Sequence, residues 1–180
     1  MLLSANETLL LAIDIQDRLL PAIHDGERVV RNTEILLQAA AHLRIPAILT
    51  EQYPKGLGAT VPQIKVAAGD SPVLEKMHFS AWGEPAVQER IAAAGRSQVV
   101  IAGIEAHVCV LQTALGLAES GHRVAVVADA ISSRHPDSVA VACTRMQAAG
   151  VELVTTEMCI FEWLGSASHP EFRALSRLIK

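Results

Sequence analysis

The chain has 180 residues, 51% of them hydrophobic, and a formal net charge of −4 at pH 7. This length suits one domain spanning residues 1–180, and an acidic balance without blocks of Lys or Arg argues against nucleic acid or an anionic membrane as a partner. No apolar run reaches the roughly 20 residues that a membrane span requires. Three cysteines without a CxxC pair, and an N-terminus unlike a signal peptide, favour a reducing, cytoplasmic setting.

Short apolar runs alternate with longer segments of helical spacing along the chain. In chain order we expect a strand at Leu9–Ile13, a helix at Glu27–Leu43, a strand at Ala47–Thr50, a loop at Glu51–Gly58, a short strand at Val73–Glu75, a helix at Glu84–Gly95 and a strand at Gln98–Ile104. There follow a helix at His107–Ser120, a strand at Arg123–Ala128, a helix at Pro136–Ala149, a strand at Val151–Thr155, and helical stretches around Glu157–Leu164 and His169–Lys180. This alternation predicts a three-layer α/β/α, Rossmann-like fold around a mostly parallel six-stranded sheet.

Three reactive residues lie at or just after expected strand ends: Asp14, Lys76 and Cys109. In folds of this kind ligands bind beyond the carboxyl ends of the strands, so we expect the three side chains to share one site. Cys109 stands where a helix begins, and the unpaired N–H groups and dipole of a helix N-terminus favour a thiolate. Asp14 has the position of a general base, although a strand-end carboxylate also serves as a helix cap or loop anchor. Lys76 could supply a counter-charge or be an ordinary surface lysine.

The remaining candidates have structural interpretations beside the functional ones. Phe79 and Trp82 lie close together in an aromatic-poor chain and could line a pocket or fill core space. His107 could pair with the Cys109 thiolate or with substrate. The other two cysteines, Cys143 and Cys159, resemble small buried hydrophobic residues. We interpret Asp129 as a loop anchor and Asp17 as a solvated loop residue. Without a GxGxxG or P-loop motif, no nucleotide cofactor is expected.

The order of these residues resembles the isochorismatase-like cysteine hydrolases over nearly the whole chain. The resemblance is carried by Asp14-x-Gln16, by Lys76 before Phe79-Ser80, by Gly103–Val110 with Thr113-Ala114, and by Val126–Ala130. The subgroup that is most similar contains the YcaC-type and isochorismatase domain-containing proteins. The resemblance implies a catalytic triad of Asp14, Lys76 and Cys109, a cis peptide bond at Ile104–Glu105, an oxyanion hole formed by the backbone N–H groups of Glu105 and Cys109, and a homo-oligomer.

The activity implied by the resemblance is hydrolysis of an amide-like C–N bond in a small molecule, through a thioester on Cys109. Gln16, Tyr53, Phe79, Trp82 and His107 are the candidate substrate-binding residues. Zinc-dependent nicotinamidases of the superfamily carry an Asp-x-His…His site, whereas the corresponding stretch here, residues 50–56, contains no histidine. We therefore expect no metal and no other cofactor. Two alternatives remain: vinyl-ether hydrolysis by Asp14 and Lys76 without the thiol, and a non-catalytic binding module.

Overall fold

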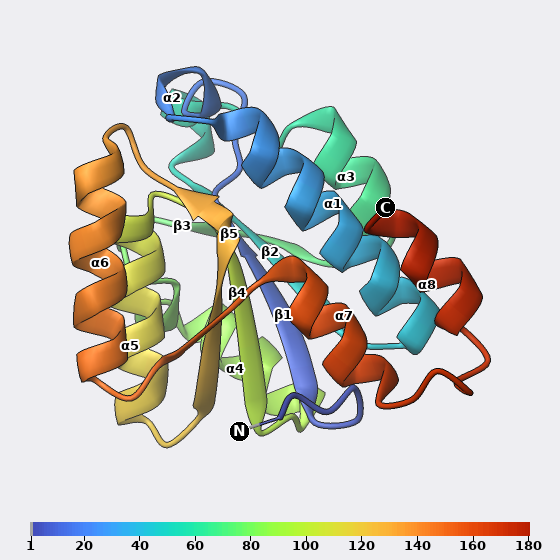
Figure 1. The fold of residues 1–180 in the computed structure, drawn as a ribbon. Helices are drawn as coiled ribbons and strands as arrows, with labels where there is room; N and C mark the ends of the chain where they lie inside the picture. The colour runs from blue at the N-terminus through green and yellow to red at the C-terminus, as the bar shows by residue number, and fades with distance from the viewer. Residues whose placement is uncertain (1) are drawn as a thin grey trace.

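The computed structural model describes residues 2–180 and has a single six-stranded sheet at its centre (Figure 1). The strands are β1 (Thr8–Ile13), β2 (Ala47–Gln52), β3 (Val73–Lys76), β4 (Gln98–Ile104), β5 (Arg123–Ser132) and β6 (Glu152–Val154). They are ordered β3-β2-β1-β4-β5-β6, and every neighbouring pair is parallel. The predicted α/β fold is therefore confirmed.

Helices cover both faces of the sheet. One layer contains α1 (Gly26–Leu43), α3 (Pro62–Ala68), α7 (Thr156–Leu164) and α8 (Phe172–Leu178), and the other contains α4 (Pro85–Ala94), α5 (Leu111–Glu119) and α6 (Pro136–Ala148) (Figure 1). Between layers, β1 and β4 are buried along their whole length. Such strands consist of continuous apolar runs, because both of their faces are covered. No helix within residues 2–180 is long and apolar enough to cross a membrane.

The structure differs from the sequence-based expectation in several connections. The expected loop after β2 contains a short helix, α2 (Pro54–Leu57), and α3 follows it in a stretch where none was predicted. Both helices begin at a proline, which suits a first helical turn but is also common in loops. Strand β5 does not stop before Asp129 but continues to Ser132, past a register shift against β4. The helix expected from His107 begins with a wider π-helical turn, η3 (Ala106–Val110).

The order of strands reverses between β1 and β4, because the chain proceeds outward from β1 on one side and from β4 on the other. These two strands pair closely up to Ile13 and Gly103. Gly103 has φ +125, and a Cβ atom at this residue would lie 2.1 Å from the carbonyl oxygen of Ile13. Glycine is therefore required for the close approach of the two strands just before Asp14 and the Cys109 turn.

Candidate active site

Asp14 directly follows β1 in a left-handed conformation, with φ 53, and is fully buried. Its Oδ1 accepts a hydrogen bond from Thr50 Oγ1 at 2.7 Å, and its Oδ2 lies 2.8 Å from Lys76 Nζ. Burial raises the pKa of the Asp14 carboxyl group, while the charge of Lys76 and hydrogen bonds from Lys76, Thr50 and Cys109 oppose that rise. Asp14 is therefore a carboxylate that is held by donors yet more basic than an exposed one.

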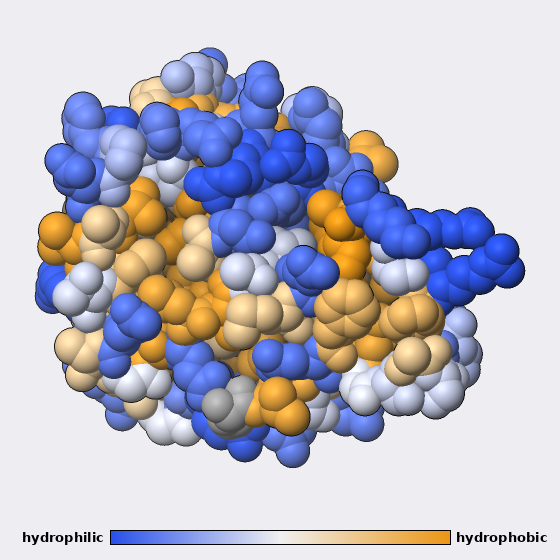
Figure 2. Space-filling view, in the orientation of Figure 1, coloured by the Kyte–Doolittle hydropathy of each residue, from blue (hydrophilic) through white to orange (hydrophobic). Residues whose placement is uncertain are grey.

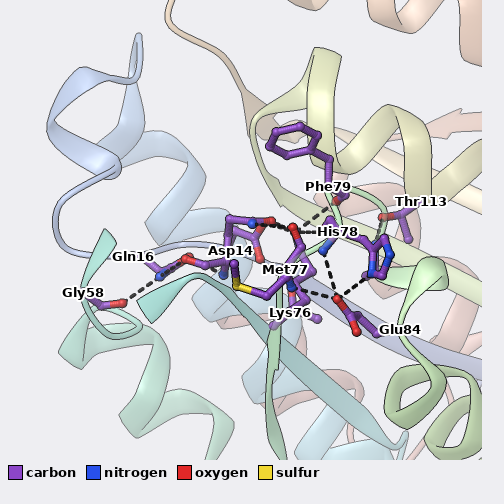
Figure 3. Close-up of polar contacts among 12 residues, drawn as sticks. Asp14, Gln16, Gly58, Lys76, Met77, His78, Phe79, Glu84 and Thr113 are labelled. Carbon is purple, nitrogen blue, oxygen red and sulfur yellow. Dashed lines mark hydrogen bonds and ion pairs between the residues drawn. The ribbon is translucent and has the colours of Figure 1, made fainter. Parts of the chain in front are cut away.

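Lys76 is the last residue of β3, and its side chain is completely shielded from solvent. Its Nζ donates hydrogen bonds to Gln52 Oε1 at 2.6 Å, to the Phe79 carbonyl at 3.0 Å and to the His78 carbonyl at 3.2 Å. These acceptors and Asp14 surround the ammonium group, which explains how a charged lysine is tolerated in the interior. Figure 3 shows Lys76 close to Asp14, which it reaches from the end of β3, two strands away from β1 in the sheet. Lys76 is thus not an ordinary surface lysine.

Cys109 lies in the π-helical turn after β4 and is only 5% exposed. Its thiol lies close enough to Asp14 and Lys76 for both groups to act on its pKa. Burial, and then the negative charge of Asp14, raise the pKa of Cys109 to about 12, although Lys76 acts in the opposite direction. The predicted preference for a thiolate at Cys109 therefore differs from the structure, in which burial and the charge of Asp14 both favour the neutral thiol.

The three strand-end residues are brought together as the sequence predicted. Aspartate, ammonium and thiol carry charges of −1, +1 and 0, so the buried cluster is neutral. Transfer of the thiol proton from Cys109 to Asp14 leaves it neutral, with the new thiolate beside Lys76. A buried site resists changes in net charge far more than internal proton transfers. The arrangement can therefore produce a nucleophilic sulfur without charging the interior.

The backbone before Cys109 contains one feature that the resemblance implied. The peptide bond between Ile104 and Glu105 is cis, as predicted. Within residues 2–180 the N–H group of Glu105 has no backbone acceptor, although its carbonyl accepts from the N–H groups of Val108 and Val110. The Glu105 side chain lies 3.0 Å from Arg134 Nε. A free N–H group next to the start of a helical turn is a suitable donor for an oxyanion.

Sequence reasoning missed three residues that support the cluster. Thr50 donates to Asp14, and Gln52 accepts from Lys76 while its Nε2 donates to the Met77 carbonyl. Glu84 Oε1 accepts hydrogen bonds from the Met77 and His78 backbone N–H groups and from the His78 ring (Figure 3). These hydrogen bonds lower the pKa of Glu84 to about 2. The position of Thr50 and Gln52 at the carboxyl end of a strand was the available signal; Glu84 offered none.

Gln16 occupies a different environment from that of a substrate ligand. Its side chain is completely buried, and its amide donates to the carbonyls of Gln52 at 3.1 Å and Gly58 at 2.6 Å while accepting from the Gln52 N–H at 2.8 Å. These bonds tie the loop after β1 to the end of β2. The structure thus assigns the Gln16 amide to the backbone of the site, with no polar atom left over for substrate.

The four other candidate binding residues lie at different places. Tyr53 and Phe79 are about half exposed on the loops after β2 and β3, and the Phe79 ring points away from Asp14 and Lys76 in Figure 3.

Trp82 packs instead against α5 and stacks edge-on with His122 at 5.3 Å, so it contributes to packing between elements. His107 bonds to Ser133 Oγ at 2.9 Å through Nδ1 and lines a groove beside α6.

The remaining acidic and thiol residues behave as expected, except that Cys143 is less buried than predicted. Asp129 accepts hydrogen bonds from the N–H and hydroxyl groups of Thr156 at the start of α7, so it is an anchor. Asp17 is exposed, Cys159 is buried, and Cys143 is half-buried.

The residues around the site do not form a metal-binding set. Glu51, in the stretch that corresponds to the zinc motif, accepts hydrogen bonds from the N–H and hydroxyl groups of Thr60. The Gln52 amide is occupied by Lys76 and Met77. Across residues 2–180, no group of three or more His, Cys, Asp or Glu side chains is arranged to hold a metal ion.

Comparisons with known proteins identify the family of the chain. The isochorismatase domain model matches residues 8–158. "Isochorismatase domain-containing protein 2" of Danio rerio is 42% identical over 178 residues, which cover 98% of this chain and 89% of the relative.

Solved structures show the same fold. The MAR1 ribonuclease of Caenorhabditis elegans superposes with a TM-score of 0.95 at 37% identity, covering 99% of this chain and 92% of that one. YcaC of Escherichia coli gives a TM-score of 0.89 at 28% identity, covering 98% and 95%. YcaC of Pseudomonas aeruginosa gives 0.89 at 27%, covering 99% and 95%. The buried strand-end cluster, the six-stranded parallel sheet and these matches together show that the chain belongs to the isochorismatase family.

Proposed function

We propose that this protein is a metal-independent cysteine hydrolase that cleaves an amide-like C–N bond of a small molecule. The observation that carries the proposal is the contact among the Cys109 thiol, the Asp14 carboxylate and the Lys76 ammonium, which lie together in the interior. A thiol, a base within hydrogen-bonding reach and a group that orients the base are the elements of nucleophilic catalysis. The relative YcaC of E. coli is described as a hydrolase of unknown specificity, which supports the reaction class.

The reaction begins with proton transfer from Cys109 Sγ to the Asp14 carboxylate. The sulfur attacks the carbonyl carbon of the substrate, and the N–H groups of Glu105 and Cys109 stabilise the resulting oxyanion. The C–N bond breaks as Asp14 returns the proton to the leaving amine, which leaves a thioester on Cys109. Water then gives a proton to Asp14 and attacks the thioester, and the C–S bond breaks as the proton returns to sulfur. Lys76 remains protonated throughout and balances the negative charge as it moves between Asp14 and Cys109.

A relative provides chemical support for a reactive nucleophile. The YcaC structure from P. aeruginosa is described as containing covalent acrylamide. Acrylamide is an electrophile that carries a primary amide, so it combines thiol reactivity with the functional group that we propose as substrate. We infer that Cys109 forms a covalent adduct with acrylamide in this protein.

Vinyl-ether hydrolysis is the second candidate, because burial raises the pKa of Asp14 and so favours a protonated carboxyl group that could act as an acid. The test is a hydrolysis screen of amides, ureides and vinyl ethers, with RNA included because the C. elegans relative is described as a ribonuclease. We expect turnover of an amide or ureide by the wild type and none by Cys109→Ala. Activity of Cys109→Ala on a vinyl ether would favour the second candidate. No turnover of any class, together with an unreactive Cys109, would indicate a binding module.

We also propose that the protein is a homo-oligomer, since E. coli YcaC is described as octameric. Sedimentation velocity of the wild type over a range of concentrations tests this directly.

A further inference from the structure

Helix α6 presents an exposed ridge that is complementary to itself. Its solvent-facing residues include Asp137 in the first turn, Val141 in the middle and Arg145 in the last turn. Val141 is 62% exposed. The spacing is i, i+4 and i+8, so the acidic and basic ends stand about 12 Å apart along the helix, at 1.5 Å per residue. Neither charged residue makes an ion pair within residues 2–180.

The surroundings of the ridge are apolar and hollowed. The exposed neighbours of Val141 on the helix are small, namely Ala140 and Thr144. Beside them, a groove of about 340 Å³ lies between α6 and the residues His107 in the π-helical turn and Leu111 at the start of α5. Figure 2, in the orientation of Figure 1, shows apolar side chains gathered on the α6 side of the molecule. Small residues let a second helix approach closely, and rows spaced i, i+4 are those that interdigitate in the commonest class of helix packing.

We propose that α6 is a subunit interface, in which α6 of one copy packs antiparallel on α6 of a second copy across a two-fold axis at Val141. In this arrangement Asp137 of each subunit faces Arg145 of the partner subunit, and the reverse pair forms at the other end. A surface that is acidic at one end, basic at the other and apolar between them is complementary to its own antiparallel copy. The same charges also suit the helix dipole, so the experiment must separate pairing between copies from stability of α6.

A charge-swap series makes that separation. Asp137→Arg and Arg145→Asp each place like charges opposite each other at both ends of the interface. The double variant restores opposite charges but keeps the unfavourable charges on the dipole of its own helix. In sedimentation velocity at micromolar concentration and low salt, we expect each single variant to dissociate into a smaller assembly at concentrations at least tenfold above those at which the wild type dissociates. The double variant should return to the mass of the wild type.

Crosslinking tests the position of the axis. In a Cys143→Ser background, Val141→Cys places a thiol against its own copy, and mild oxidation should give disulfide-linked dimers on a non-reducing gel. Val66→Cys is the matched control, because Val66 is 82% exposed on α3, away from the interface, and should give none. A monomeric wild type, single variants that keep the wild-type mass, or a double variant that dissociates as far as the single ones would each overturn the proposal. It does not depend on the proposed hydrolase activity.

Discussion

At Asp14, burial and a counter-charge act on one carboxyl group in opposite directions. Burial raises its pKa, and the ammonium group of Lys76, 2.8 Å away, resists the change. The pair therefore places a carboxyl group that is more basic than an exposed one beside the Cys109 thiol. The raised pKa of Asp14 also implies that activity falls on acidification at a pH above the ordinary aspartate value of 3.8.

Replacing Lys76 with methionine tests how strongly its positive charge opposes the effect of burial on the pKa of Asp14. The variant leaves Asp14 buried without its cation, so we expect a loss of about 3–5 kcal/mol in the free energy of unfolding at neutral pH. The Asp14 pKa should rise further above its unfolded value of 3.8, so this loss should shrink as pH falls toward 3.8 and the carboxyl group is protonated in both states. Urea unfolding between pH 4 and 8 measures it. The control Asp14→Asn/Lys76→Met should show no such pH dependence, and a pH-independent loss in Lys76→Met would contradict the explanation.

At the scale of elements, the loop between β3 and α4 determines where the lysine points. The backbone carbonyls of His78 and Phe79 hold the Lys76 ammonium group, and Glu84 in turn holds the N–H groups of Met77 and His78. Glu84 thus acts on the site through the backbone. It is a positioning residue, and its effect should appear in the turnover rate and pH profile as well as in stability.

Glu84→Gln tests that role. Because the folded-state pKa of Glu84 is lowered from 4.5 to about 2, its stabilising contribution is complete above pH 4.5 and is lost as pH falls toward 2. The difference in unfolding free energy between the wild type and Glu84→Gln should therefore disappear over that interval. We also expect kcat to fall more than KM changes, and the acid limb of the kcat/KM profile to shift as Lys76 becomes less well placed. An unchanged profile with full activity would show that the loop holds Lys76 without Glu84.

A substitution at Gly103 tests how much the close contact between β1 and β4 contributes to stability. Gly103→Ala would place a Cβ atom 2.1 Å from the Ile13 carbonyl oxygen, and we expect a loss of stability of about 3 kcal/mol or more. Gly121→Ala is the matched control, since Gly121 also has a positive φ, +93, but open space around it. That variant should lose about 1 kcal/mol, from backbone strain alone. Chemical denaturation of both variants gives the comparison, and equal losses would mean that the close approach of the strands is unimportant.

The sequence predicted the strands more accurately than the hydrogen-bond partners of the side chains in the site. Apolar runs such as Leu9–Ile13 identify buried strands whatever surrounds them, and the strand ends then place Asp14, Lys76 and Cys109 at one edge of the sheet. By contrast, the groups that hold these residues come from positions far apart in the chain. Nothing near Gln16 indicates that its amide would bind the backbone of Gln52 and Gly58. The raised pKa of Cys109 could not be predicted for the same reason, because it results first from burial in the fold and then from a carboxylate 95 residues away.

At the scale of the whole molecule, the parallel sheet concentrates the chemistry at one end. The strand order reverses between β1 and β4, and Asp14 and Cys109 follow these two strands. The histidines, in contrast, are distributed around the molecule and mostly occupied locally: His42 with Glu171, His78 with Glu84, and His107 with Ser133. We therefore expect the proposed hydrolysis to depend on the Cys109 thiol and not on a histidine.

Removal of metal ions tests whether the proposed hydrolysis proceeds without one. We expect hydrolysis of the substrate found in the screen to be unchanged after dialysis against EDTA, and unchanged again on addition of Zn²⁺, because the side chains around Asp14 that could bind a metal are engaged by Thr50, Thr60 and Lys76. Loss of activity on chelation, with recovery on adding the metal, would require a different mechanism.

The central claim is that Asp14 takes the proton of Cys109, and the rate of covalent modification of Cys109 by acrylamide in the wild type and in Asp14→Asn measures it most directly. Intact mass spectrometry follows the adduct, with Cys109→Ser identifying its site and the half-buried Cys143 as the internal reference. A general base contributes about 100-fold or more, so modification should slow by that factor in Asp14→Asn while Cys143 is unaffected. If Asp14 only raised the pKa of Cys109 through its charge, removing the charge would lower that pKa, and an equal or faster reaction in Asp14→Asn would contradict the account.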